Sequence, residues 1–364
     1  MAFFNCSGIG IAGIACAVPD NEVTVDSFVP VFGEEIPAKF TAGTGIKAMF
    51  KALPDQTASD LAYAAAENLF AHLPVDRSEI GALLFVTQSP DYRRPATACV
   101  LQHRLGLSMD CAAMDIGLGC SGFIYGLQTA MSLMMQSDMK YCLLLMGETA
   151  SKLVHPLDKS IVMMYGDAGA AILLERQPEA RSVTLLRSDG SRFKAIILPA
   201  GGFRDMNPPA DRFVCMDGIE RSLYDIYMEG TSVFSFSISN VPQAVLDYLA
   251  YTRTTPDEYD LFLFHQANQF IIKQLSRKLK LPKEKVPISL DRYGNSGGIS
   301  IPLTLCANYG GEQGMGVKRA FMAGFGIGLS WGVTSAEIDM DRVFRVVKTR
   351  DWYVEGKITP EMLM

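Results

Sequence analysis

Cys120 stands between glycines in the segment Gly119-Cys120-Ser121-Gly122, directly after an apolar run over residues 111–116. The residues that follow have helical spacing, so the segment predicts a tight turn from a strand into a helix that begins next to Cys120. Unpaired N–H groups and the positive end of the helix dipole stabilise a thiolate at such a position. The pattern favours a nucleophile near neutral pH, although a free cysteine taken alone is more often an inert, buried side chain.

His265 and Asn295 are two further candidates for chemistry. His265 is one of only four histidines and follows the apolar run 261–264, at the end of a predicted buried strand, where open sheets often carry active-site residues. Asn295 lies in the glycine-rich turn Gly294-Asn295-Ser296-Gly297. The alternatives are a structural histidine at a strand end and an ordinary turn asparagine.

An internal repeat indicates how these residues meet. Residues 79–86 and 258–265 each place a polar cluster before a short apolar strand, and each is followed by a helical stretch. After that helical stretch, and at nearly the same number of residues from it, one copy contains Gly-Cys-Ser-Gly and the other contains Gly-Asn-Ser-Gly. We therefore predict a duplicated unit in residues 1–178 and 179–341, with the loops that carry Cys120 and Asn295 converging. Residues 342–364 form a tail to which the sequence assigns no function.

The strands alternate with helices, and several strands are apolar throughout. Such strands are buried on both faces, so the pattern predicts an α/β fold with mixed sheets covered by helices. The chain has 364 residues, of which 49% are apolar and 20% charged, and this size favours two halves over a single core. The segment 204–221, with its adjacent prolines and its charges, is interpreted as a surface excursion.

Composition argues against several classes of function. The net charge is −6 and no run of Lys and Arg occurs, so we expect neither nucleic-acid nor anionic-membrane binding. The first 38 residues contain no Lys or Arg, so the apolar start is interpreted as a strand and not as a signal peptide. No apolar run is long enough to cross a bilayer. The eight cysteines show neither zinc spacing nor a disulfide framework, which favours a reduced, cytoplasmic protein without a metal.

Three motifs together resemble those of the β-ketoacyl-acyl-carrier-protein synthase III family: Gly119-Cys120-Ser121-Gly122, His265-Gln266-Ala267-Asn268 and Gly294-Asn295-Ser296-Gly297-Gly298. Residues 166–170 and 324–332 also match family elements, and the resemblance covers about residues 5 to 340. It implies a thiolase-like fold, in which two duplicated α/β halves form a layered α-β-α-β-α core. It also implies a homodimer, and a reaction without metal or redox cofactor.

The resemblance implies a decarboxylative Claisen condensation. Cys120 takes an acyl group from a thioester, with the oxyanion held by the backbone N–H groups of Cys120 and Ile327. His265 and Asn295 then stabilise the enolate formed when a malonyl thioester loses carbon dioxide, and Phe325 packs beside the leaving carboxylate. The product is a 3-oxoacyl thioester, and an acyl-carrier protein is the expected partner.

The chain departs from the family pattern where the family binds its donors. Lys39 and Lys159 stand where relatives often clamp the adenine of coenzyme A between Trp and Arg, and lysine cannot replace a planar stacking group. Phe270 stands where relatives often place an arginine that faces the carrier protein. Arg277 and Lys278 remain candidates for carrier binding, although exposed basic residues at a helix end are common without such a role.

Arg94 is a further departure, because many relatives place an apolar residue before the following proline, where it reaches into the acyl pocket of the partner subunit. Arg94 therefore either enters that pocket as a substrate-binding residue or turns to solvent. Two other functions remain open from the sequence. One is transfer of the acyl group on Cys120 to a hydroxyl or amine, and the other is a non-catalytic partner subunit of a synthase pair.

Overall fold

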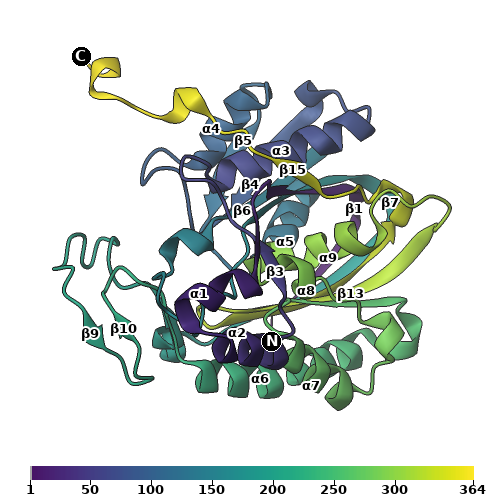
Figure 1. Cartoon of the computed structure of the whole chain (residues 1–364). Helices are drawn as coiled ribbons and strands as arrows, with labels where there is room; N and C mark the ends of the chain where they lie inside the picture. The colour runs from purple at the N-terminus through teal and green to yellow at the C-terminus, as the bar shows by residue number, and fades with distance from the viewer. Residues whose placement is uncertain (1) are drawn as a thin grey trace.

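A nine-stranded mixed sheet runs through the centre of the computed structural model, which describes residues 2–364 (Figure 1). Two long strands, β1 (Ala2–Pro19) and β7 (Ala168–Ser188), pair with each other in antiparallel fashion along most of their length. The remaining strands of the sheet are β4 (Ile80–Val86), β5 (Ala112–Ile116), β6 (Tyr141–Glu148), β12 (Leu261–Phe264), β13 (Val317–Gly326), β14 (Ser330–Asp339) and β15 (Val347–Thr349).

The strand pairing repeats on the two sides of the β1–β7 pair. On one side β4 is parallel to β6, and β6 is antiparallel to the first part of β7. On the other side β12 is parallel to β13, β13 is antiparallel to β14, and β14 pairs with the second part of β7. The predicted boundary at residue 178 lies inside β7, so the division into two halves stays an interpretation of this pairing pattern.

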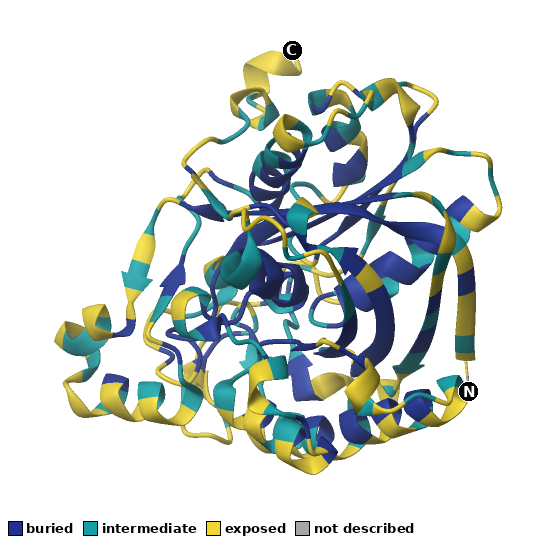
Figure 2. Cartoon of the chain, turned by 90° about the vertical axis from the view of Figure 1, so that its right-hand side faces the viewer, coloured by how far each residue is buried: buried dark blue, intermediate teal, exposed yellow. Residues whose placement is uncertain are grey.

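Helices form three layers that alternate with the strands. Helices α3 (Ala58–His72) and α4 (Thr97–Arg104) cover the outer face of the β4–β6 side, and α6 (Gly230–Thr252) and α7 (Gln269–Leu279) lie beyond the β12–β14 side (Figure 1). Between them lie α5 (Gly122–Met135) and α9 (Ser300–Tyr309), whose buried side chains join a core with strands of both sides. Figure 2 shows this middle layer mostly buried, whereas α6 and α7 each expose one face. The predicted layered α-β-α-β-α arrangement is confirmed.

Shorter elements complete the fold. They are β2 (Glu22–Thr24), β3 (Ala48–Phe50), β8 (Ile196–Ile197), β9 (Phe213–Val214), β10 (Glu220–Arg221), β11 (Tyr227–Met228), α1 (Val29–Phe32), α2 (Glu35–Thr44) and α8 (Leu290–Tyr293). The predicted surface excursion contains the β9–β10 hairpin, which projects from the body of the molecule at the left of Figure 1. Within residues 2–364, no helix is both long and apolar enough to span a membrane.

The C-terminal tail is held by a buried ion pair. Arg104, at the end of α4, contacts Asp60 at 3.0 Å, and both side chains are almost completely buried. The guanidinium of Arg104 lies over the rings of Tyr63 and Tyr353, at 4.6 and 4.4 Å from their centroids, and the backbone N–H of Tyr353 donates to Asp60 at 2.9 Å. Arg104 and Asp60 therefore attach the segment around Tyr353 to α3 and α4.

We expect Arg104→Ala to lower the free energy of unfolding by about 3–5 kcal/mol, because it leaves the Asp60 carboxylate buried without its partner. Urea unfolding monitored by circular dichroism measures the change. Arg350→Ala is the matched control, since its ion pair with Asp20 at 2.8 Å is exposed and should contribute less than about 1 kcal/mol. Equal losses in the two variants would contradict a special role for the buried pair.

Candidate active site

Cys120, His265 and Asn295 line one cavity of about 160 Å³. They come from three separate segments, and the cavity walls also include Phe325 and Ile327, as expected from the sequence. Most of the remaining lining is apolar, with contributions from Leu153, Ile196, Ile226, Met228, Val233, Phe234 and Ile271. Such a cavity can hold an acyl group beside a thiol, an imidazole and an amide.

Cys120 occupies the predicted turn between a strand and a helix. β5 ends at Ile116 and α5 begins at Gly122, two residues after the cysteine. The end of β13 passes close by: a Cβ atom added at Gly326 would lie 2.7 Å from the Sγ atom of Cys120. Glycine at this position is therefore required for the strand to pass the nucleophile.

The thiol is not activated in the way the sequence predicts. Burial raises the pKa of Cys120 to about 11, the backbone N–H of Ile327 opposes this shift, and the charge of Glu148 adds to it. Loss of hydration therefore outweighs the favourable hydrogen bonds at the start of the helix. Burial of the unliganded site therefore opposes the expected thiolate, which stays a prediction.

His265 is held by Ser300, which begins α9. Its Nδ1 atom lies 2.9 Å from the Ser300 hydroxyl, and that hydroxyl also accepts a hydrogen bond from the backbone N–H of Gln266 at 3.1 Å. The histidine is 2% exposed, and its ring packs edge-on against Phe325 with centroids 5.5 Å apart. Burial lowers the pKa of His265 to about 4, which a hydrogen bond to the Gly297 backbone partly offsets, so the imidazole is neutral at pH 7.

Asn295 is fixed through both its backbone and its side chain. Its backbone N–H donates to Met164 at 2.8 Å, and its carbonyl accepts from Gly166 at 3.1 Å. Its Oδ1 atom accepts from the backbone N–H of Gly297 at 3.0 Å. Because the amide oxygen is used in this way, the Nδ2 group is left as the donor that the side chain offers to the cavity.

Glu148 is a further residue in the cavity wall, and it was not among the residues predicted from the sequence. Its carboxylate accepts from the backbone N–H of Gln88 at 2.7 Å and from the hydroxyl of Ser89 at 3.0 Å. Burial nevertheless raises the pKa of Glu148 to about 7. A single carboxylate at the end of the apolar run 141–147 is the sequence signal that points to it.

The other predicted site residues lie outside this cavity. Arg94 is exposed, with its guanidinium 6.0 Å from the ring centroid of Phe203 in the same chain, so its entry into a partner's pocket stays a prediction. Arg277 and Lys278 are exposed near the end of α7, and Lys278 donates to the backbone carbonyl of Ile238 at 2.9 Å. Carrier binding by these two residues also stays a prediction.

Comparison with known proteins places this geometry in a family. Residues 114–190 match the family described as 3-oxoacyl-[acyl-carrier-protein] synthase III, and residues 249–338 match the description of its C-terminal part. A putative 3-oxoacyl-[acyl-carrier-protein] synthase 3 of Campylobacter jejuni is 33% identical over 330 residues, which cover 88% of this chain and 92% of the relative. The chain belongs to the β-ketoacyl-acyl-carrier-protein synthase III family. Members of this family are condensing enzymes that join an acyl primer to a malonyl thioester with loss of carbon dioxide.

Solved structures agree with the family assignment. A 3-oxoacyl-(acyl-carrier protein) synthase from Burkholderia xenovorans LB400 superposes with a TM-score of 0.90 at 35% identity, covering 96% of this chain and 99% of that one. A synthase III from Thermus thermophilus gives a TM-score of 0.76 at 29% identity, covering 90% and 98%. The thiolase-like fold expected of a synthase III is therefore confirmed.

The raised pKa of Cys120 predicts how this thiol reacts with iodoacetamide. Its alkylation rate should rise roughly tenfold per pH unit between about pH 7 and 9, because only the thiolate reacts and its fraction grows in that proportion below the pKa. Peptide mapping after timed alkylation gives the rate, and the exposed Cys99 serves as a reference in the same digest. A rate for Cys120 that is already constant below about pH 8 would show that a thiolate exists at neutral pH.

Proposed function

We propose that Cys120 carries the acyl primer and that His265 and Asn295 stabilise the enolate of the malonyl unit. The observation that carries this proposal is the hydrogen bonding of these two side chains. Ser300 Oγ accepts from Gln266 and can donate its own proton to Nδ1 of His265, and in that tautomer the imidazole proton lies on Nε2. Asn295 likewise keeps its Nδ2 donor free, because Gly297 uses its oxygen.

In the first half-reaction the sulfur of Cys120 attacks the thioester carbonyl. A bond forms between this sulfur and the acyl carbon, the bond to the donor sulfur breaks, and the donor leaves as a thiol with the proton of Cys120. The backbone N–H groups of Cys120 and Ile327 both act to lower the pKa of the Cys120 thiol, which supports a shared role in holding the oxyanion.

In the second half-reaction a malonyl thioester loses carbon dioxide, and its enolate oxygen accepts hydrogen bonds from His265 and Asn295. Because the pKa of His265 is lowered to about 4, the ring is neutral at pH 7. A neutral imidazole donates a hydrogen bond to the enolate but is too weak an acid to protonate it. The enolate carbon then attacks the acyl group on Cys120. A carbon–carbon bond forms, the carbon–sulfur bond breaks with its electron pair going to the sulfur, and the Cys120 thiolate takes up one proton from water to restore the thiol.

We expect His265→Ala and Asn295→Ala to lose malonyl decarboxylation by about 10²- to 10³-fold, the usual cost of removing an oxyanion donor. Both variants should still form acyl-Cys120, more slowly for the histidine variant. Release of labelled carbon dioxide and intact-mass detection of the acyl-enzyme measure the two steps separately. Unchanged carbon dioxide release by Asn295→Ala would remove Asn295 from the proposed role.

The same experiment separates the proposed function from its alternatives. An enzyme that transfers the acyl group to a hydroxyl or amine would acylate Cys120 without releasing carbon dioxide from malonyl thioester. A non-catalytic partner subunit would not acylate itself. Screening the intact mass of the protein against acyl thioesters of coenzyme A and of acyl-carrier protein also identifies the primer.

We also propose that the enzyme acts as a cytoplasmic homodimer and takes its acyl groups from a carrier protein. The support for a carrier comes from the residues that replace the adenine clamp. Lys39 is exposed and pairs with Glu35 on its own helix, and Lys159 is exposed as well. Neither offers a planar surface to adenine. Arg277 and Lys278 provide positive charge near the end of α7 for an acidic carrier.

We therefore expect acyl-carrier protein to acylate Cys120 faster than coenzyme A carrying the same acyl group. Loss of base stacking costs roughly 1–3 kcal/mol, or about tenfold to a hundredfold in affinity, which a carrier-bound donor does not incur. The measurement is the rate of acyl-enzyme formation with each donor. Equal or faster acylation by the coenzyme A thioester would show that other contacts replace the clamp.

A further inference from the structure

A second cavity of about 700 Å³ lies beside the candidate active site, within the usual range for small-molecule sites. The β8–β11 ribbon forms a wall shared by the two cavities. Ile196 and Met228, which pair in register, line the active-site cavity, whereas the next pair, Ile197 and Tyr227, lines the second cavity. Successive side chains of a strand point to opposite faces, so one thin ribbon separates the two spaces.

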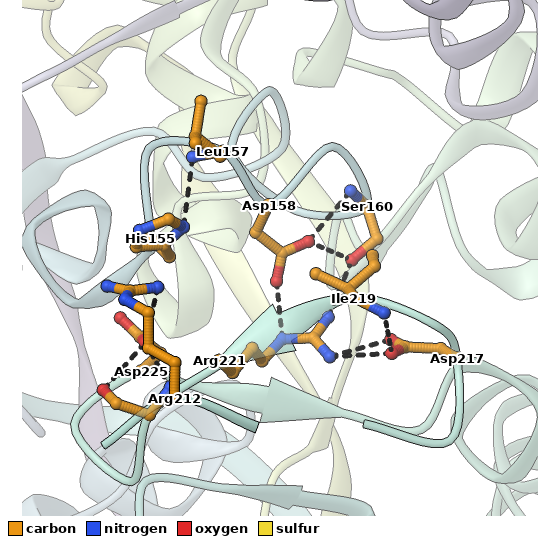
Figure 3. A network of polar contacts seen from close by, with 10 residues as sticks. His155, Leu157, Asp158, Ser160, Arg212, Asp217, Ile219, Arg221 and Asp225 are labelled. Atoms are coloured by element: carbon orange, nitrogen blue, oxygen red, sulfur yellow. Dashed lines mark hydrogen bonds and ion pairs between the residues drawn. The ribbon is translucent and has the colours of Figure 1, made fainter. Parts of the chain in front are cut away.

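The far wall of this second cavity is anchored by a buried arginine. Arg221, on β10, lies 2.6 Å from Asp158, and both side chains are only 1% exposed. The guanidinium also bonds to Asp217 at 2.9 Å and to the hydroxyl of Ser160 at 3.2 Å, as Figure 3 shows. Because a buried ion pair stabilises only in a fixed geometry, this network holds the β9–β10 hairpin to the body of the protein.

The cavity offers a mainly apolar surface. Val214 and Met216, at the tip of the hairpin, are 72% and 92% exposed and also line the cavity. Phe213, Pro199 and Leu223 continue this surface inward. Apolar side chains gathered around an open cavity mark a site where an apolar group binds.

The charges around the cavity leave one cation without a carboxylate partner. Arg192 pairs with Asp189 at 2.7 Å, and Arg221 pairs with Asp158 and Asp217. The two acidic lining residues are also engaged, since Asp225 accepts from Ser222, and Glu229 accepts from the backbone of Ser232. Lys194 is exposed and lies 5.6 Å from the ring centroid of Phe193, and among residues 2–364 it has no carboxylate within ion-pair distance.

We propose that this second cavity binds a long-chain fatty acid, with its alkyl chain against the hairpin and its carboxylate paired with Lys194. An apolar surface with a single cation that lacks a carboxylate partner fits an amphipathic anion better than a sugar or a nucleotide, which need several polar partners. The β8–β11 ribbon borders both cavities. A fatty acid in the second cavity therefore contacts one face of the ribbon and affects the position of Ile196 and Met228, which line the active-site cavity on the other face. The proposal goes beyond the condensation reaction itself.

Photolabelling of the full chain tests the proposal without relying on activity. The probe is myristic acid with a diazirine in its alkyl chain, and the readout is peptide mapping. We expect saturable labelling of peptides that contain residues 192–197 and 213–223. Lys194→Glu should weaken labelling at least tenfold, whereas Lys283→Glu, an exposed lysine far along the chain and outside the cavity lining, should leave it unchanged. The uncharged tetradecanol probe should also label at least tenfold more weakly.

The double variant Val214→Asp with Met216→Asp tests the apolar contact, and both side chains are exposed enough for the fold to tolerate the change. It should abolish labelling. Labelling confined to peptides around Cys120, equal labelling of Lys194→Glu and the parent protein, or no saturable labelling would each overturn the proposal. The last result is expected if a second copy of this chain covers the hairpin.

A kinetic measurement tests the shared wall and rests on the proposed function. Myristate should raise KM for the primer in the parent protein and leave it unchanged in Lys194→Glu. If the condensation itself is absent, this measurement fails while photolabelling still reports on the cavity. Labelling of the second cavity without any effect on KM would overturn the role of the ribbon.

Discussion

The geometry of the candidate site depends on the close approach of two backbone turns. A Cβ atom added at Gly298 would lie 2.5 Å from the carbonyl oxygen of Gly119, and one at Gly166 would lie 2.0 Å from that of Tyr293. Real side chains cannot occupy these distances, so both contacts require glycine. The first contact joins the turn of Cys120 to the turn of Asn295, and the second holds the turn of Asn295 against the segment before β7. The distance between Cys120 and Asn295 is set by contacts between backbone atoms, which can shift less than side chains.

Burial determines the charge states of the titratable side chains in the active-site cavity. The pKa of Cys120 is raised to about 11, that of Glu148 is raised to about 7, and that of His265 is lowered to about 4. All three shifts favour the neutral form, and all three have loss of hydration as their largest cause. An oxyanion formed in such a chamber meets fixed N–H donors and little competing charge, which is the condition under which those donors stabilise it most.

The sequence predicts the parts of this site that local patterns determine. Cys120 and Asn295 stand out because glycines mark their turns, and His265 because it follows a short apolar strand; the layered fold follows from the repeat and the family resemblance. Ser300 and Glu148 could not be identified in the same way, since a serine in an apolar helix and an acid at a strand end are common. The pKa of Cys120 was beyond local reasoning too, because it depends on burial by segments distant in the sequence.

The first strand has consequences for the order in which this chain can fold. β1 pairs with β7 along most of its length, but Ala17, Val18 and Pro19 pair with Val347, Lys348 and Thr349 of β15. Contacts between residues so far apart in sequence are slow to form, since a long loop must close first. During synthesis, this pairing therefore stays open until residues 347–349 have left the ribosome. Until then the exposed edge of β1 is a surface that a chaperone, or another nascent chain, can bind.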